Sequence, residues 1–264
     1  MFEFHKDLAR YFEMNVSNSR EHIVPFIAAV KPLKNGMRVL DIGCGEGGVV
    51  NPLLDMGLTA VGVELNPERI INAKKYLANH VHQNKITFVS KDIYTPGIEN
   101  EWGGGKFDVI ILKDVIEHIF DQKKLMAHLQ NFLKDDGVVF FGFPPWQMPY
   151  GGHQQLLQNK YLSKIPYYHL LPMPLYKSIL KAANENVENM VDIKQTGISI
   201  ERFERIVNRT GYKILNQKHY LLNPIYQYKF GWKPKAQFTW LSGIPWVRNF
   251  FTSGVYYLIG KKSS

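Results

Sequence analysis

The sequence predicts an α/β protein built around a parallel β-sheet that is covered on both faces. Between residues 37 and 143, short apolar runs alternate with helix-like stretches, as expected for strands that are each followed by a helix. The apolar runs are nearly continuous, which is typical of strands buried on both sides. The chain has 264 residues, 45% hydrophobic and 21% charged, which suits one large domain with insertions and excludes general disorder.

Seven segments are expected to form strands, and they are residues 37–42, 59–64, 86–90, 107–112, 137–143, 212–222 and 254–260. Asn66-Pro67 is expected to open a helix that runs to about His80, because Asn caps helices and Pro suits their first turn. Asp121 and Ser199 are expected to cap two further helices. Pro52 should interrupt or delay the helix that follows the first strand.

Two segments rich in proline and aromatic residues break the repeat. We therefore expect an N-terminal helical cap over residues 1–36 and a ligand-binding domain over 37–143 and 199–264. The two irregular segments, residues 144–198 and 223–252, are expected to form lid insertions over the site.

Cysteine content and hydropathy indicate the cellular compartment in which the chain is expected. Cys44 is the only cysteine, so an internal disulfide and a cysteine-based zinc cluster are both excluded, and we expect no bound metal. The N-terminus is charged throughout, and no run of about 20 apolar residues occurs. The chain is therefore expected to be cytoplasmic.

The net charge of +9 is concentrated in the second half of the chain. Residues 1–150 carry 16 Lys+Arg and 18 Asp+Glu, whereas residues 151–264 carry 16 and 5. Such a basic half indicates either an anionic partner, such as nucleic acid, phospholipid headgroups or an acidic substrate, or simply a soluble surface. The scattered placement of the lysines leaves both interpretations open.

A glycine-rich loop, VLDIGCGEGG at residues 39–48, is the most informative stretch. Glycines let the backbone take unusual dihedral angles and lie close against a ligand, although a bare tight turn also uses them. Carboxylates follow the neighbouring strands, with Glu64 after the second strand and Asp92 after the third. Because ligands bind at the carboxyl ends of parallel strands, these residues predict one pocket for a nucleoside.

The acidic residues of the loop restrict the ligand further. A dinucleotide site has the pattern G-x-G-x-x-G and holds a pyrophosphate at the helix N-terminus. Here Asp41 precedes the glycines and Glu46 lies among them, and carboxylates repel phosphate. The loop therefore favours a cationic group, such as an α-amino group or a sulfonium.

Four motifs resemble those of the class I S-adenosylmethionine-dependent methyltransferases: VLDIGCGEGG, VGVELNP, KDIYTP and FDVIILKDVIEHI. The resemblance covers about residues 20–143 and resumes in the last helix and strands. It implies a Rossmann-like, doubly wound and mostly parallel seven-stranded sheet whose last strand is antiparallel. The DVIEHI stretch is most similar to the subgroup that methylates small molecules, including quinone precursors.

The resemblance implies that the cofactor is S-adenosyl-L-methionine. It places the methionine part against Asp41, Gly43, Cys44 and Gly45, the ribose at Glu64 with Leu65 beside it, the adenine at Asp92 and Ile93, and the backbone of Lys113 beside the methionine end. On the N-terminal helix, Tyr11 and Phe12 are candidates to close over the cofactor, and Arg20 is a candidate to pair with its carboxylate.

Two histidines are candidates for work at the methyl acceptor. Methyl transfer requires an aligned acceptor and a dry site, and a nearby histidine can remove a proton. His153 follows Gly151-Gly152 just past the fifth strand and is our candidate base, with a loop-bracing role as the alternative. His118 is expected to hold the turn after the fourth strand.

The partner expected is a small-molecule or lipid-like methyl acceptor. Trp232, Trp240 and Trp246 with neighbouring lysines also suit contact with a membrane surface or stacking on nucleic acid. No recognised nucleic-acid-binding motif occurs, which disfavours nucleic acid, and no obligate protein partner is evident. The alternatives are an RNA or protein methyltransferase, a protein that binds the cofactor without turnover, and a nicotinamide dehydrogenase.

Overall fold

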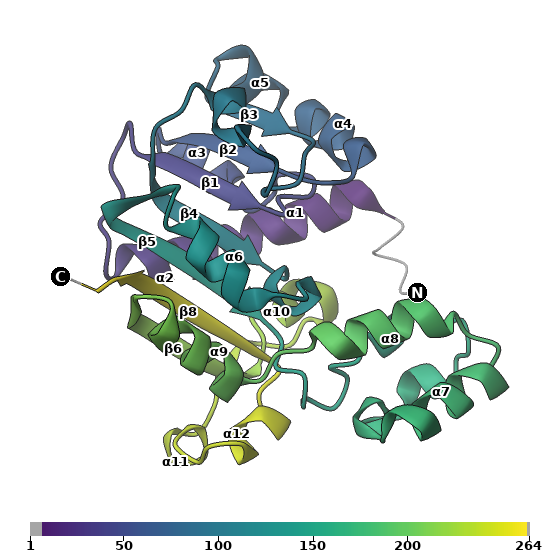
Figure 1. The fold of residues 1–264 in the computed structure, drawn as a ribbon. Helices are drawn as coiled ribbons and strands as arrows, with labels where there is room; N and C mark the ends of the chain where they lie inside the picture. The colour runs from purple at the N-terminus through teal and green to yellow at the C-terminus, as the bar shows by residue number, and fades with distance from the viewer. Residues whose placement is uncertain (1–6, 263–264) are drawn as a thin grey trace.

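The computed structural model describes residues 7–262, and its centre is an eight-stranded sheet in the order β3-β2-β1-β4-β5-β8-β6-β7 (Figure 1). The strands β1 to β5 run parallel to one another, and β8 is antiparallel to both β5 and β6. The strands are β1 Arg38–Ile42, β2 Thr59–Val63, β3 Ile86–Val89, β4 Phe107–Lys113, β5 Leu133–Phe143, β6 Tyr212–Leu222, β7 Lys235–Ala236 and β8 Gly254–Lys261. The predicted fold class is confirmed, and the two-residue edge strand β7 adds an eighth strand to the seven expected.

Helices cover both faces of this sheet because the strand residues alternate between two apolar layers. Along β4, Ile110 and Leu112 pack toward helices α6 (Gln122–Leu129) and α9 (Ile200–Arg209). Val109 and Ile111 point the other way. On that face lie α1 (Leu8–Asn18), the π-helical turn η2 (Ser19–Ile23), α2 (Val24–Ala28) and α3 (Asn51–Asp55).

The helix starts agree with the predicted caps. Asn66 Oδ1 accepts a hydrogen bond from the Glu68 backbone N–H at 2.9 Å, and Asp121 and Ser199 cap α6 and α9 in the same way. The helix after Asn66 is divided at Leu77 into α4 (Pro67–Tyr76) and α5 (Ala78–His82), whereas the sequence predicted a single continuous helix. Helix α3 begins only at Asn51, with Pro52 in its first turn, so the delayed start is confirmed.

Residues 144–198 form a small subdomain beside the carboxyl end of β5. It contains the 3-10 turns η5 (Gln154–Leu156), η6 (Leu162–Lys164) and η7 (Tyr168–Leu170) and the helices α7 (Met173–Ala182) and α8 (Val187–Thr196). Tyr176, Leu180 and Met190 belong to its own apolar cluster, and α7 stands clear of the sheet in Figure 1. A hydrogen bond from Trp146 N–H to Ile198 O at 2.8 Å joins the two ends of the segment.

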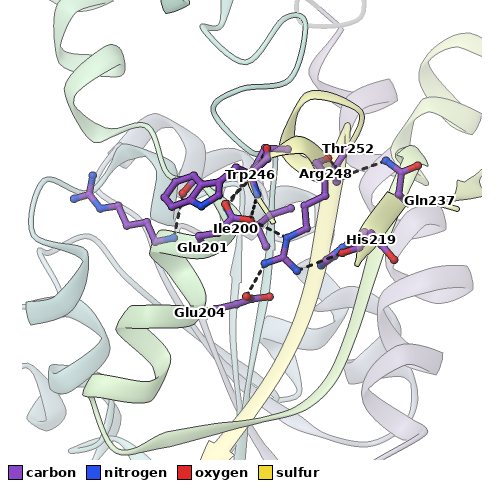
Figure 2. A network of polar contacts seen from close by, with 12 residues as sticks. Ile200, Glu201, Glu204, His219, Gln237, Trp246, Arg248 and Thr252 are labelled. Atoms are coloured by element: carbon purple, nitrogen blue, oxygen red, sulfur yellow. Dashed lines mark hydrogen bonds and ion pairs between the residues drawn. The ribbon is translucent and has the colours of Figure 1, made fainter. Parts of the chain in front are cut away.

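Residues 223–252 contain α10 (Ile225–Phe230), β7, α11 (Thr239–Ser242) and α12 (Val247–Phe250). Figure 2 shows how Arg248 holds this segment to α9: its guanidinium donates to Glu201 at 2.9 Å and to Glu204 at 2.6 Å. At the other end, Ile225 of α10 packs on Met14 of α1. The segment therefore spans from α9 to the N-terminal helix.

The 3-10 helix η3 (Ile98–Trp102) precedes β4, and the 3-10 helix η4 (Ile116–His118) follows it. Within residues 7–262, no helix combines the length and the apolar character that crossing a membrane requires.

Candidate functional site

The glycine loop after β1 is fixed by hydrogen bonds to the neighbouring strand. The backbone N–H groups of Gly43 and Cys44 both donate to Val63 O at the end of β2, at 2.8 and 3.1 Å. Gly43 has a φ of 71°, in the left-handed region that favours glycine. A Cβ at Gly43 would also lie 2.5 Å from Val115 Cγ2, so a side chain here would be both strained and crowded.

A cleft lies against this loop. Its walls combine the loop with Tyr11 and Phe12 of α1, with Lys113 at the end of β4 and with Asp114 directly after it. The cleft therefore lies at the carboxyl ends of the central strands, where the sequence predicts it.

Two carboxylates, one in the loop and one after β2, accept hydrogen bonds from groups of the protein. Glu64 is buried and accepts hydrogen bonds from the backbone N–H groups of Gly45 and Asn66, both at 3.0 Å. Glu46 accepts two hydrogen bonds from Arg69, at 3.0 and 2.9 Å. Arg69 Nη1 also lies 3.6 Å from Glu64, so this arginine brackets both acids.

Arg69 is a site residue that the sequence analysis did not single out. It lies in the first turn of α4, and a Cβ on Gly45 would collide with its guanidinium. Its position three residues after the Asn66 cap, on the helix that follows the ribose-type carboxylate, is the signal that would have found it.

Asp41 differs from its neighbours because part of its carboxyl group has no partner. The side chain is buried, and Oδ2 makes no hydrogen bond within residues 7–262. Burial raises the pKa of Asp41 to about 8, against the opposing effect of Lys113. A buried carboxyl group in this condition suits a cationic ligand, whose charge would favour its ionised form.

Positive charge lies close to the cleft at Lys113 and Lys229. Lys113 Nζ donates to Asp114 Oδ2 at 2.5 Å, and its side chain is only 9% exposed. Lys229 of α10 lies 5.8 Å from the centre of the Tyr11 ring, and burial lowers its pKa to about 8. Burial opposes the ionisation of Asp114, but Lys113 beside it holds the pKa of that carboxyl below its usual range.

The remaining predicted cofactor residues lie in different surroundings. Cys44 is buried in the loop, and burial raises the pKa of its thiol, which makes it a poor nucleophile. Asp92 is exposed and accepts from Tyr94 N–H at 2.9 Å, whereas Ile93 is buried in the core. Leu65 is 69% exposed next to Glu64.

Arg20 has a different partner from the one expected. It pairs with Asp55 at 3.3 Å on the surface, and its side chain is 58% exposed. Like Asp41, Gly45 and Glu64, it is not among the residues that line the cleft. Because its guanidinium is engaged at the surface, the site that we propose below does not include Arg20.

The two candidate histidines lie together. The His118 and His153 ring centres are 4.9 Å apart, and His153 has a φ of 53°. Burial lowers the pKa of both, to about 4 for His153, where His118 adds to the effect. His153 is therefore neutral at pH 7 and a weak base. Beside them Glu117 is buried, and neither of its carboxylate oxygens has a partner in the described chain.

The fold and this cleft define a Rossmann-like enzyme domain of the methyltransferase type. A family model described as a methyltransferase domain matches residues 15–190, more than half of the chain, and the chain belongs to this family. The resemblance seen in the sequence motifs is thereby confirmed.

Individual relatives agree with the family but match only part of the chain. A ubiquinone biosynthesis O-methyltransferase from Bartonella tribocorum is 32% identical over 112 residues, which is 42% of this chain and 42% of the relative. The chain thus spans less than half the length of that curated relative.

Solved structures share the fold at low identity. The magnesium protoporphyrin IX methyltransferase of Synechocystis, with bound S-adenosylhomocysteine, has a TM-score of 0.56 and 16% identity, covering 99% of this chain and 89% of its own. An S-adenosylmethionine-dependent methyltransferase from Clostridium acetobutylicum has a TM-score of 0.57 and 15% identity, covering 94% and 92%. These two structures support the fold.

Proposed function

We propose that this chain is an S-adenosylmethionine-dependent methyltransferase that acts on a small or lipid-like acceptor. The observation that carries the proposal is Asp41, a buried carboxyl group with an unpartnered oxygen near the end of β1, directly before the glycine loop that lines the cleft. Such a group fits a cationic ligand and disfavours a pyrophosphate, so the proposal excludes a nicotinamide dehydrogenase.

In this proposal, residues that line the cleft and residues next to it bind different parts of the cofactor. Asp41 and the backbone at Gly43 and Gly45 would hold the amino end, while Lys113 and Lys229 supply positive charge for the carboxylate. Glu64, fixed by two backbone N–H groups, would accept from the ribose hydroxyls. The exposed Leu65 and Asp92, with the backbone of Ile93, would contact the adenine.

The chemistry needs little from the protein beyond placement. When bound, the sulfonium supplies an activated methyl group. The chain must then align the acceptor and exclude water, and α1 and the 144–198 segment are placed at the carboxyl edge of the sheet to do so. We retain His153 as a residue of the acceptor site; its low pKa favours a role as a ligand or hydrogen-bond partner over one as a strong base.

Calorimetric titration with S-adenosylmethionine and S-adenosylhomocysteine tests the cofactor. Glu64→Ala should weaken binding by about 2 kcal/mol or more, because charge-assisted hydrogen bonds to the ribose are lost. Glu68→Ala, an exposed glutamate on the next helix, is the matched control and should leave affinity unchanged. Equal affinity of Glu64→Ala and the parent, or binding of NAD instead, would refute this site.

Turnover separates the remaining alternatives. A small-molecule enzyme should form S-adenosylhomocysteine with phenolic or lipid-like acceptors at a rate that depends little on salt. Activity toward RNA, or toward a protein substrate that binds to the basic surface of this chain, should fall steeply with salt. Tight cofactor binding with no product from any acceptor would indicate a protein that binds without catalysis.

We further propose that the 223–252 segment contacts an anionic membrane surface. Trp232, Trp240 and Trp246 are 54%, 68% and 56% exposed, and Lys233 and Lys235 lie among them. Exposed tryptophans beside lysines suit the interface of an anionic bilayer. The protein should co-sediment with phosphatidylserine-containing vesicles, and Trp240→Ala/Trp246→Ala should reduce the bound fraction several-fold. Equal binding of parent and variant would contradict this contact.

A further inference from the structure

We propose that Glu117, His118 and His153 form a binding site for one divalent transition-metal ion beside the cofactor cleft. Glu117 and His118 come from the 3-10 turn after β4, and His153 precedes η5 in the 144–198 segment. The proposal runs against the expectation from the sequence that the chain holds no metal.

The three side chains already converge on one point. One ligand atom from each lies within 4.8 Å of the other two. A tetrahedral ion bound at about 2.1 Å places its ligand atoms roughly 3.4 Å apart, so only a small contraction is required. Two imidazole nitrogens and one carboxylate oxygen are a donor set that zinc and iron(II) bind.

The polar atoms of the cluster lack other partners. Glu117 is only 4% exposed, yet both of its carboxylate oxygens and His153 Nδ1 are buried without a hydrogen-bond partner among the described residues. Leaving such groups unpaired costs free energy, and buried polar atoms in proteins are nearly always satisfied. A cation between them would satisfy all three residues at once.

The arrangement of the neighbouring groups leaves the three side chains available to an ion. Asp114, the nearest other acid, is engaged by Lys113 at 2.5 Å and is not required as a ligand. The left-handed backbone of His153, at a φ of 53°, is a strained conformation that aims its ring at His118.

Three protein ligands leave one position of a tetrahedral ion open. Pro144, Trp146 and Ile198 line the narrow space beside Glu117 and His153. An acceptor hydroxyl that reached the open position could bind the ion, lose its proton to water and keep the electron pair on oxygen, because a bound cation lowers the pKa of such a group. This assignment of the acceptor rests on the proposed function, whereas ion binding itself does not.

Direct titration of the chelator-stripped full-length protein tests the site. We expect Zn²⁺, measured against a chromophoric chelator, to bind with a stoichiometry of one, and Co²⁺ to give the visible absorption of a four-coordinate ion. Glu117→Gln and His153→Ala should each weaken binding by a factor of about 100 or more. His82→Ala and Glu99→Gln, which change exposed residues of the same types, should leave it unchanged.

Titration of the same protein samples with S-adenosylhomocysteine separates this proposal from the proposed function and shows that each variant is folded. Normal binding of S-adenosylhomocysteine with no bound ion, or equal ion affinity in the site and control variants, would overturn the metal site alone. Ion binding without S-adenosylhomocysteine binding would overturn the proposed function and leave the metal site standing.

Discussion

Two polar clusters in this molecule each contain a largely buried glutamate and differ in whether its oxygens have partners. Around Arg248, Glu201 accepts from the guanidinium at 2.9 Å, from Trp246 N–H at 2.8 Å and from Asn249 at 2.6 Å (Figure 2). Around Glu117, neither carboxylate oxygen has a hydrogen-bond partner in the part of the chain that the structure describes. Burial of charge alone therefore does not identify a functional site, and the unpartnered oxygens of Glu117 are what distinguish the second cluster.

The positions of the two clusters explain the difference. The Arg248 cluster connects α12 to α9 and the sheet, and Tyr257 of β8 adds a hydrogen bond to Glu204 at 2.7 Å. This cluster holds the 223–252 segment in place, and its charged groups find their partners within the chain itself. The Glu117 cluster lies at the carboxyl edge of the sheet, next to the cleft, so its unpartnered oxygen and nitrogen atoms are available to a ligand.

The largest effect is expected from breaking the satisfied cluster. Glu201→Met removes a carboxylate that is only 10% exposed and leaves Asn249 and Trp246 N–H without their acceptor. Loss of one partner from a buried ion pair should lower the free energy of unfolding by about 3 kcal/mol. Urea denaturation of the variant measures this change.

Glu188→Met is the matched control, because Glu188 is also the second residue of a helix but is exposed. It should change stability by less than about 0.5 kcal/mol. Similar losses in both variants would show that the Arg248 cluster contributes no more than an ordinary surface charge.

A smaller effect is expected at Asp41, whose unpartnered oxygen we propose as a binding group for the cofactor. With a pKa of about 8 the free protein holds a proton there at pH 7, and a cationic ligand must displace it. Affinity for S-adenosylmethionine should therefore fall as pH drops below 8, by at most about tenfold per unit.

Calorimetry in buffers of different ionisation enthalpy counts the proton released on binding. Asp41→Asn should release fewer protons than the parent at pH 7, and the comparison cancels any ionisation of the ligand itself. The same proton count in both proteins would mean that Asp41 does not respond to the cofactor.

The sequence predicted the strands, the helix caps and the glycine loop well because these features follow local rules. Strands, caps and the glycine loop are encoded by neighbouring residues, and the strand-end rule brought Asp41 and Glu64 to one edge. The His118–His153 contact joins residues 35 positions apart through an irregular segment, and the edge strand β7 has only two residues. No periodicity encodes such contacts, so they required the three-dimensional structure.

The smallest effect, of opposite sign, is expected from the same substitution in the unsatisfied cluster. Burial raises the pKa of Glu117 above its usual range. An acid whose pKa is raised by folding stabilises the protein below its unfolded pKa, and that stability is lost as pH rises through its folded pKa. In the metal-free protein, Glu117→Met should therefore raise the free energy of unfolding by about 1 kcal/mol at pH 7 and by less near pH 4. Urea denaturation at both pH values, with Glu201→Met beside it, measures the contrast; destabilisation by both substitutions would show that Glu117 has a structural partner after all.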